Sequence, residues 1–87
     1  MEAAKLLVHQ ANVDHGTAKM LCDVLEHAWA SVQPQFEGHL AKIRGAVTIA
    51  NSLITLADQG ERDPLVLRAF ALSRVRELLE PPHADEK

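Results

Sequence analysis

The middle of the chain carries the pattern that decides the fold, because residues 36–57 read FEGHLAKIRGAVTIANSLITLA. Apolar residues recur in this stretch at alternating spacings of four and three positions. They are Phe36, Leu40, Ile43, Val47, Ala50, Ile54 and Ala57. Such a heptad spacing predicts a long helix with an apolar seam along one side. We expect this helix to begin at Pro34 and to end near Gln59.

The same predicted helix carries a second apolar stripe beside the seam. Its members are Ala46, Ile49, Leu53 and Leu56. The two stripes together make an apolar arc too wide for a single neighbour in the second half of the helix. The sequence therefore predicts that this helix packs against more than one other helix.

Residues 60–64 carry the signals of a tight turn between two helices. Gly60 suits the position just after a helix end, Asp63 suits an N-cap, and Pro64 suits the first helical position. A turn this short makes the flanking helices antiparallel neighbours. The second of them is expected to run to about Glu80 and to stop at Pro81-Pro82.

The first third of the chain leaves two readings open. Apolar residues keep one helical phase from residue 2 to residue 32, which favours a single long helix. Residues 12–16, however, read NVDHG, a poor helix sequence in which Asp14 could cap a second helix. Pro34 disfavours a helical backbone conformation at Gln33, so the helical segment should end there in either case.

Composition supports an all-α fold. The chain has 87 residues, of which 47% are hydrophobic and 3% aromatic, with 4 Gly, 4 Pro and no Tyr. Residues that favour strands are too few for a sheet to be the main element. We expect an antiparallel bundle of three long helices, or four if the first breaks near residues 12–16. Residues 1–80 are predicted to form one domain, and residues 81–87 a flexible tail.

Charge and cysteine content narrow the classes of function. The 12 acidic residues outnumber the 9 lysines and arginines, giving a net charge of −3, which argues against attachment to nucleic acid or anionic lipid through bulk charge. The single cysteine excludes an internal disulfide framework. With neither a long apolar run nor a signal-peptide pattern, we expect a cytoplasmic protein that does not enter a membrane.

The five histidines raise the possibility of a metal site. Asp23 and His27 are four residues apart on one helix face, with His9 in phase. A tight site needs three or four ligands, and a solvated helix surface is the more ordinary reading, so we predict neither metal nor cofactor. Cys22 lies at the edge of the apolar arc and is predicted to be a core residue. No catalytic motif is present, and we expect no enzyme activity.

Charged residues on the later helices suggest two further hypotheses. His39 and Arg68 fall within otherwise apolar arcs, so either could hold an anionic ligand or an ion pair. The more ordinary role is that the apolar part of the side chain packs while its polar group stays in water. Four arginines, at positions 62, 68, 74 and 76, could contact DNA. Nearby acidic residues neutralise that segment, and its helix spacing fits a DNA-binding helix-turn-helix poorly.

The sequence thus favours a small, non-catalytic interaction or regulatory module that associates with itself or with a helical protein partner. Surplus apolar residues near the tight turn are the expected interface of a homodimer. They are Ile49, Leu53, Leu56, Val66 and Phe70. The alternative function is a DNA-binding regulator that uses the last helix, and a third is a metal protein or enzyme built around His9, Asp23 and His27.

Overall fold

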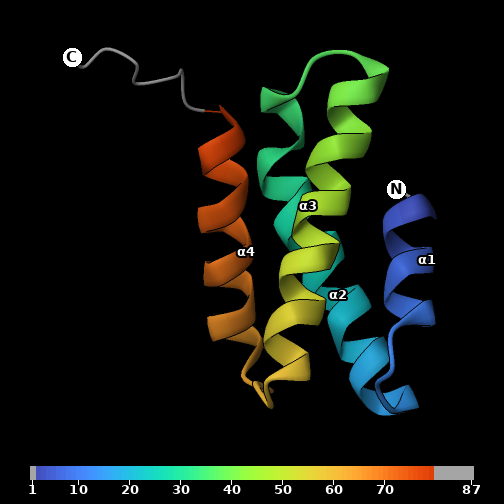
Figure 1. The fold of residues 1–87 in the computed structure, drawn as a ribbon. Helices are drawn as coiled ribbons and strands as arrows, with labels where there is room; N and C mark the ends of the chain where they lie inside the picture. The colour runs from blue at the N-terminus through green and yellow to red at the C-terminus, as the bar shows by residue number, and fades with distance from the viewer. Residues whose placement is uncertain (1, 80–87) are drawn as a thin grey trace.

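The computed structural model describes residues 2–79, which form four α-helices joined by short connections (Figure 1). The elements are α1 (Glu2–Gln10), α2 (His15–Val32), the 3₁₀ turn η1 (Gln33–Gln35), α3 (His39–Asp58) and α4 (Pro64–Leu79). Within these residues there is no strand, so the all-α prediction is confirmed, in the version with four helices.

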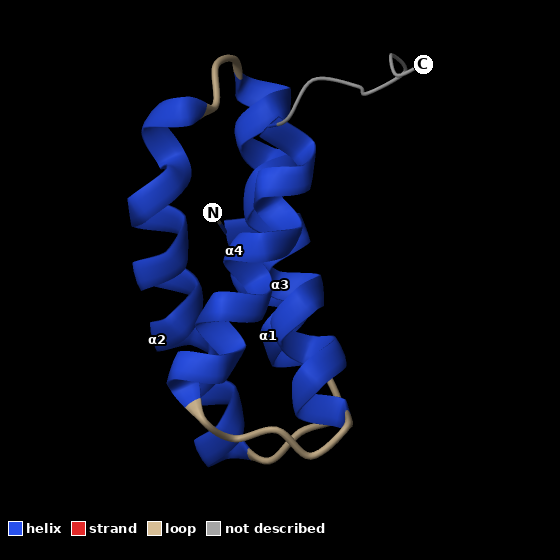
Figure 2. Cartoon of the chain, turned by 90° about the vertical axis from the view of Figure 1, so that its left-hand side faces the viewer, coloured by secondary structure: helices blue, strands red, loops and turns tan. Residues whose placement is uncertain are grey.

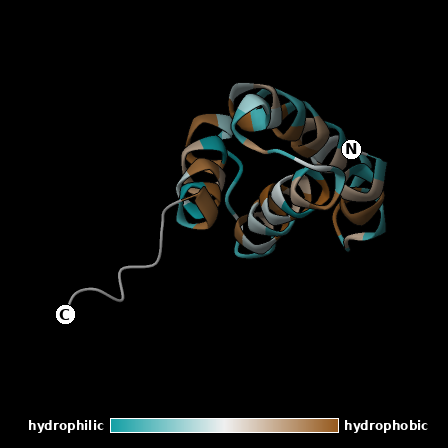
Figure 3. Cartoon of the chain, turned by 90° about the horizontal axis from the view of Figure 1, so that it is seen from above, coloured by the Kyte–Doolittle hydropathy of each residue, from teal (hydrophilic) through white to brown (hydrophobic). Residues whose placement is uncertain are grey.

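Successive helices run in opposite directions, and α3 is the central one. It packs against α1, α2 and α4. Figure 2 shows the α1–α2 and α3–α4 connections at one end of the bundle and the α2–α3 connection at the other. Seen along the bundle in Figure 3, each helix carries both polar and apolar segments. The largest fully buried side chains are Leu21, Leu25, Ile49, Leu53, Leu67, Val8 and Val75.

The first segment breaks into two helices because Asp14 caps α2. One carboxylate oxygen of Asp14 accepts a hydrogen bond from the Thr17 amide at 3.0 Å. The other accepts one from the Thr17 hydroxyl at 2.6 Å. The first of these bonds satisfies a helix-terminal amide that has no carbonyl partner within the helix. The segment therefore forms two helices, although its apolar residues keep one helical phase throughout.

The Asp14 cap makes the stability of the fold depend on pH. The hydrogen bonds from Thr17 lower the pKa of the Asp14 carboxyl below its ordinary value of 3.8. The unfolded chain therefore takes up this proton first as the pH falls, and the contribution of the cap is lost as the pH passes through the lowered, folded-state value. We expect the stability advantage over Asp14→Asn, which caps without titrating, to shrink below about pH 4 in urea titrations. An advantage that grew on acidification would contradict this.

The connection before α3 corrects the predicted start of that helix. Pro34 lies in the 3₁₀ turn, and α3 begins only at His39. Gly38 has a φ of 92°, a left-handed conformation that favours glycine and that reorients the chain before the helix. Phe36, predicted to belong to the helical seam, instead sits in extended backbone, with its ring buried 5.4 Å from that of Trp29.

The turn between α3 and α4 follows the sequence prediction. Gly60 has a φ of 102°, and an Asp63 carboxylate oxygen accepts from the Leu65 amide at 3.0 Å. The Arg62 guanidinium donates to the Ala57 carbonyl at 2.7 Å, which satisfies a carbonyl at the end of α3. The predicted helix end at Glu80 and the predicted tail over 81–87 lie outside the described residues.

Helix α3 is long and apolar enough to cross a membrane, judged by length and composition alone. The same properties suit the central helix of a bundle. Here Ile49, Ala50 and Leu53 of α3 are fully buried against the rest of the chain. Contacts with the other helices thus account for the apolar residues in the second half of α3.

Candidate functional site

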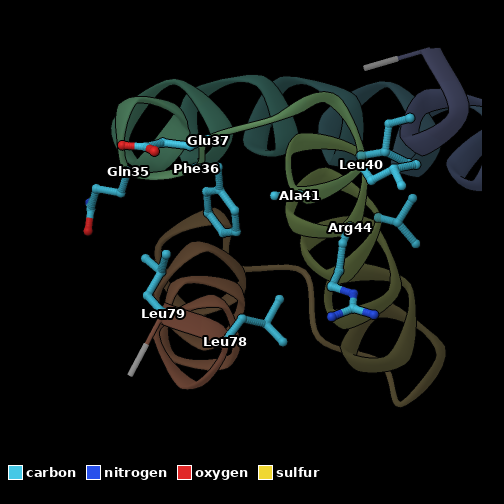
Figure 4. A pocket seen from close by; sticks show the side chains of 10 residues that line it. Gln35, Phe36, Glu37, Leu40, Ala41, Arg44, Leu78 and Leu79 are labelled. Carbon is cyan, nitrogen blue, oxygen red and sulfur yellow. The ribbon is translucent and has the colours of Figure 1, made fainter. Parts of the chain in front are cut away.

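An open apolar groove of about 790 Å³ lies between the first half of α3 and the last turn of α4. The 3₁₀ turn and the residues after it close one end. Figure 4 shows the side chains that surround it, with Arg44 extending from α3 and Leu78 from α4. Its apolar lining consists of Phe36, Leu40, Ala41, Ile43, Val47, Leu78 and Leu79.

The groove exists because the heptad seam of α3 is covered over only part of its length. Ala50 and Ala57, in the second half of the seam, are buried in the core. Leu40 at the start is 79% exposed, although it belongs to the same seam. Leu78 of α4, which lines the same groove, is 42% exposed. Large apolar side chains from two helices therefore face solvent at one groove, an arrangement typical of interaction sites.

Two opposite charges also line the groove. Glu37 belongs to the connection before α3, and Arg44 lies within α3. Neither forms an ion pair within residues 2–79, where the recorded salt bridge joins Lys5 to Glu26 at 2.6 Å. Because both are exposed, they can meet the charges of a molecule that enters the groove.

The predicted interface near the α3–α4 turn is not one surface. Ile49 and Leu53 are fully buried in the core, which corrects their assignment as surface contacts. Leu56 and Phe70 are half-buried, and the guanidinium carbon of Arg74 lies 5.9 Å from the Phe70 ring centre. Val66 is 44% exposed. Helical phase alone could not separate the stripe that other helices cover from the surface that stays open.

The other charged candidates occupy separate places on the surface. His39 is the first residue of α3 and Arg68 lies in α4; both are exposed, and the described chain provides no ion pair for either. Among the arginines of the DNA hypothesis, Arg62 bonds the end of α3 and Arg74 lies over Phe70. Two of the four side chains are thus held in contacts with their own chain.

The candidate metal ligands do not converge. The His27 imidazole, through Nδ1, donates to the backbone carbonyl of Asp23 at 2.9 Å, and not to its carboxylate. His9 and Asp23 line one hollow that His27 does not reach. There the Nε2 of His9 lies 3.8 Å from the sulfur of Cys22. Over residues 2–79 no three His, Cys, Asp or Glu side chains are grouped so that they could share a metal ion.

The Cys22 thiol is half-buried, and burial raises its pKa. Because the thiolate is the reactive form, we expect iodoacetamide to modify native Cys22 more slowly than the same residue in the urea-unfolded chain at pH 8. Mass spectrometry of timed samples measures both rates without ambiguity, since the chain has one cysteine. Faster modification of the native protein would instead indicate a thiol activated by His9.

Comparisons with protein-family models, with curated proteins and with solved structures give no match. The most distinctive surface of this chain is the groove between α3 and α4, which combines exposed leucines with one acidic and one basic side chain.

Proposed function

We propose that this chain is a small, non-catalytic interaction module that binds protein in the α3–α4 groove. The observation that carries the proposal is the exposure of two leucines that line that groove, Leu40 of α3 and Leu78 of α4. Full burial of a leucine side chain contributes about 1.5–3 kcal/mol. Covering Leu40 alone could thus strengthen binding about ten- to hundredfold.

The form of the groove favours a protein helix as its occupant. It is an open channel between two antiparallel helices, with an apolar lining and charged residues at its edges. Helical partners commonly place an apolar face in such a groove. The DNA-binding alternative has weaker support, because two of its four arginines are engaged in contacts with their own chain.

Two leucines provide a matched test of this proposal. Leu40 is the second residue of α3 and 79% exposed, and Leu65 is the second residue of α4 and 75% exposed. Only Leu40 lines the groove. We expect proteins that co-purify with the unmodified chain, a differently tagged copy included, to be lost with Leu40→Glu and kept with Leu65→Glu.

Both variants should stay folded, because neither leucine contributes to the buried core, and circular dichroism serves as the check. Retention of the same proteins by both variants would show that the groove is not the binding surface. Equal loss with both would show that binding depends on general surface hydrophobicity.

A further inference from the structure

We propose that a second hollow between α3 and α4 binds a carboxylate, with the guanidinium of Arg74 as its main contact. The hollow has a volume of about 300 Å³ and lies closer to the α3–α4 turn than the apolar groove does. Four polar residues of α3 and two residues of α4 line it. They are Thr48, Asn51, Ser52, Thr55, Phe70 and Arg74. The inference goes beyond the proposed function, because it assigns a ligand to a surface outside the groove.

Arg74 brings a positive charge that the described chain leaves unpaired. No carboxylate of residues 2–79 is in ion-pair contact with its guanidinium. Its neighbour one turn earlier in α4 is Phe70, whose ring centre lies 5.9 Å from the guanidinium carbon. An aromatic ring attracts a cation without using its N–H donors in hydrogen bonds to oxygen. The contact therefore helps to hold the guanidinium in place and leaves its donors for a ligand.

The α3 wall of the hollow is uncharged and holds further hydrogen-bond donors. The Ser52 hydroxyl donates to the Thr48 carbonyl at 2.8 Å. The Thr55 hydroxyl donates to the Asn51 carbonyl, also at 2.8 Å. These two hydroxyl hydrogens are used within the helix, whereas the side-chain amide of Asn51 and the hydroxyl of Thr48 can donate to a ligand. None of the described residues that line the hollow is acidic, so an anion meets no like charge there.

A carboxylate fits this set of groups better than a phosphate does. Its two oxygens match the paired N–H donors of a guanidinium, and Arg74 alone balances its single charge. A phosphate ester carries a charge of about −1.5 to −2 at neutral pH. It would need a second cation, and among the described residues of the lining Arg74 is the one cation.

The hollow adjoins the apolar groove on both helices. In α3, Thr48 of the hollow follows Arg44 of the groove by four residues. In α4, Arg74 precedes Leu78 of the groove by four. Four residues make about one helical turn, so the same step leads from groove to hollow along either helix. A protein bound in the groove can thus place an acidic side chain or its C-terminal carboxylate against Arg74. This link alone rests on the proposed function.

NMR titration of the ¹⁵N-labelled full chain with sodium acetate at neutral pH tests the site, with sodium chloride lowered to keep the ionic strength constant. We expect saturable shifts of the Asn51 side-chain amide. Arg74→Gln should weaken acetate binding about tenfold or more. Arg74→Lys should also weaken it, because lysine keeps the charge but lacks the paired donors. Arg76→Gln is the matched control, since it removes the same charge from an exposed residue of α4 outside the lining. It should leave acetate binding unchanged.

Two further probes distinguish the sources of the carboxylate. The α-amide of N-acetylglutamic acid carries its carboxylate on the side chain, whereas N-acetylalanine carries one at the α-carbon, as the end of a chain does. Binding of either probe more tightly than acetate, with loss in Arg74→Gln, would support the site and identify the source.

Three results would overturn the inference. Shifts that rise without saturation, or binding that Arg74→Gln and Arg76→Gln weaken equally, would show only a general attraction of anions to surface charge. Tighter binding of inorganic phosphate than of acetate would contradict the assignment to a carboxylate. Leu40→Glu separates this site from the groove, because it should leave acetate binding unchanged even where it abolishes protein binding. Failure of either proposal can therefore be distinguished from failure of the other.

Discussion

Replacing Leu53 by alanine is expected to lower the free energy of unfolding by about 2–5 kcal/mol. Leu53 is fully buried in the central helix α3, among side chains from the surrounding helices. The substitution removes apolar contacts and leaves a cavity, and the neighbouring helices can fill it only in part. Denaturant unfolding followed by circular dichroism measures the loss.

Leu65→Ala is the matched control for this experiment, because it makes the same chemical change at a side chain that is 75% exposed. We expect this control to change stability by about 0.5 kcal/mol or less. Equal denaturant midpoints for Leu53→Ala and the unmodified protein would contradict the central position of α3.

Gly45→Ala is expected to destabilise the protein, although alanine normally stabilises a helix. A Cβ at position 45 would lie 2.8 Å from the ring atoms Cζ of Phe36 and Cζ3 of Trp29. Both rings are buried, so neither can move away freely. Overpacking of a core costs about 1–3 kcal/mol, against a gain in helix propensity of about 0.5–1 kcal/mol. The expected net effect is a loss of up to about 2.5 kcal/mol in the free energy of unfolding.

Gly16→Ala provides the comparison for Gly45→Ala. Gly16 lies in the first turn of α2, and a Cβ there would approach only the Asp14 carboxylate, at 3.4 Å. The change should therefore be neutral or slightly stabilising. If Gly45→Ala raised the unfolding midpoint as Gly16→Ala does, the close packing of Trp29 and Phe36 on α3 would be wrong.

The parts of the fold that the sequence predicts correctly depend on local chemistry. Asp14 caps α2 and Asp63 caps α4, in each case through hydrogen bonds to amides two or three residues ahead. Gly60 adopts the left-handed conformation expected after a helix end. These interactions involve neighbouring residues and need no knowledge of the tertiary fold.

The start of α3 and the open groove could not be predicted in the same way. Phe36 continues the heptad spacing, yet its ring packs on Trp29 of another helix, and the chain reorients at Gly38 before α3 begins. Likewise, the exposure of Leu40 depends on where the neighbouring helices lie. The spacing of apolar residues shows which of them share a helix face. Whether that face is buried depends on the length and placement of the other helices.

The most direct measurement of self-association through the groove is disulfide trapping at position 40. Cys22→Ser removes the single cysteine, and Leu40→Cys or Leu65→Cys then places a new one at an exposed site. A disulfide requires Cα atoms about 4.4–6.8 Å apart, so trapping reports which exposed position lies close to its counterpart in another copy. Mild oxidation should link most Leu40→Cys chains into dimers and leave Leu65→Cys chains monomeric. Trapping at position 65 with none at position 40 would contradict the account.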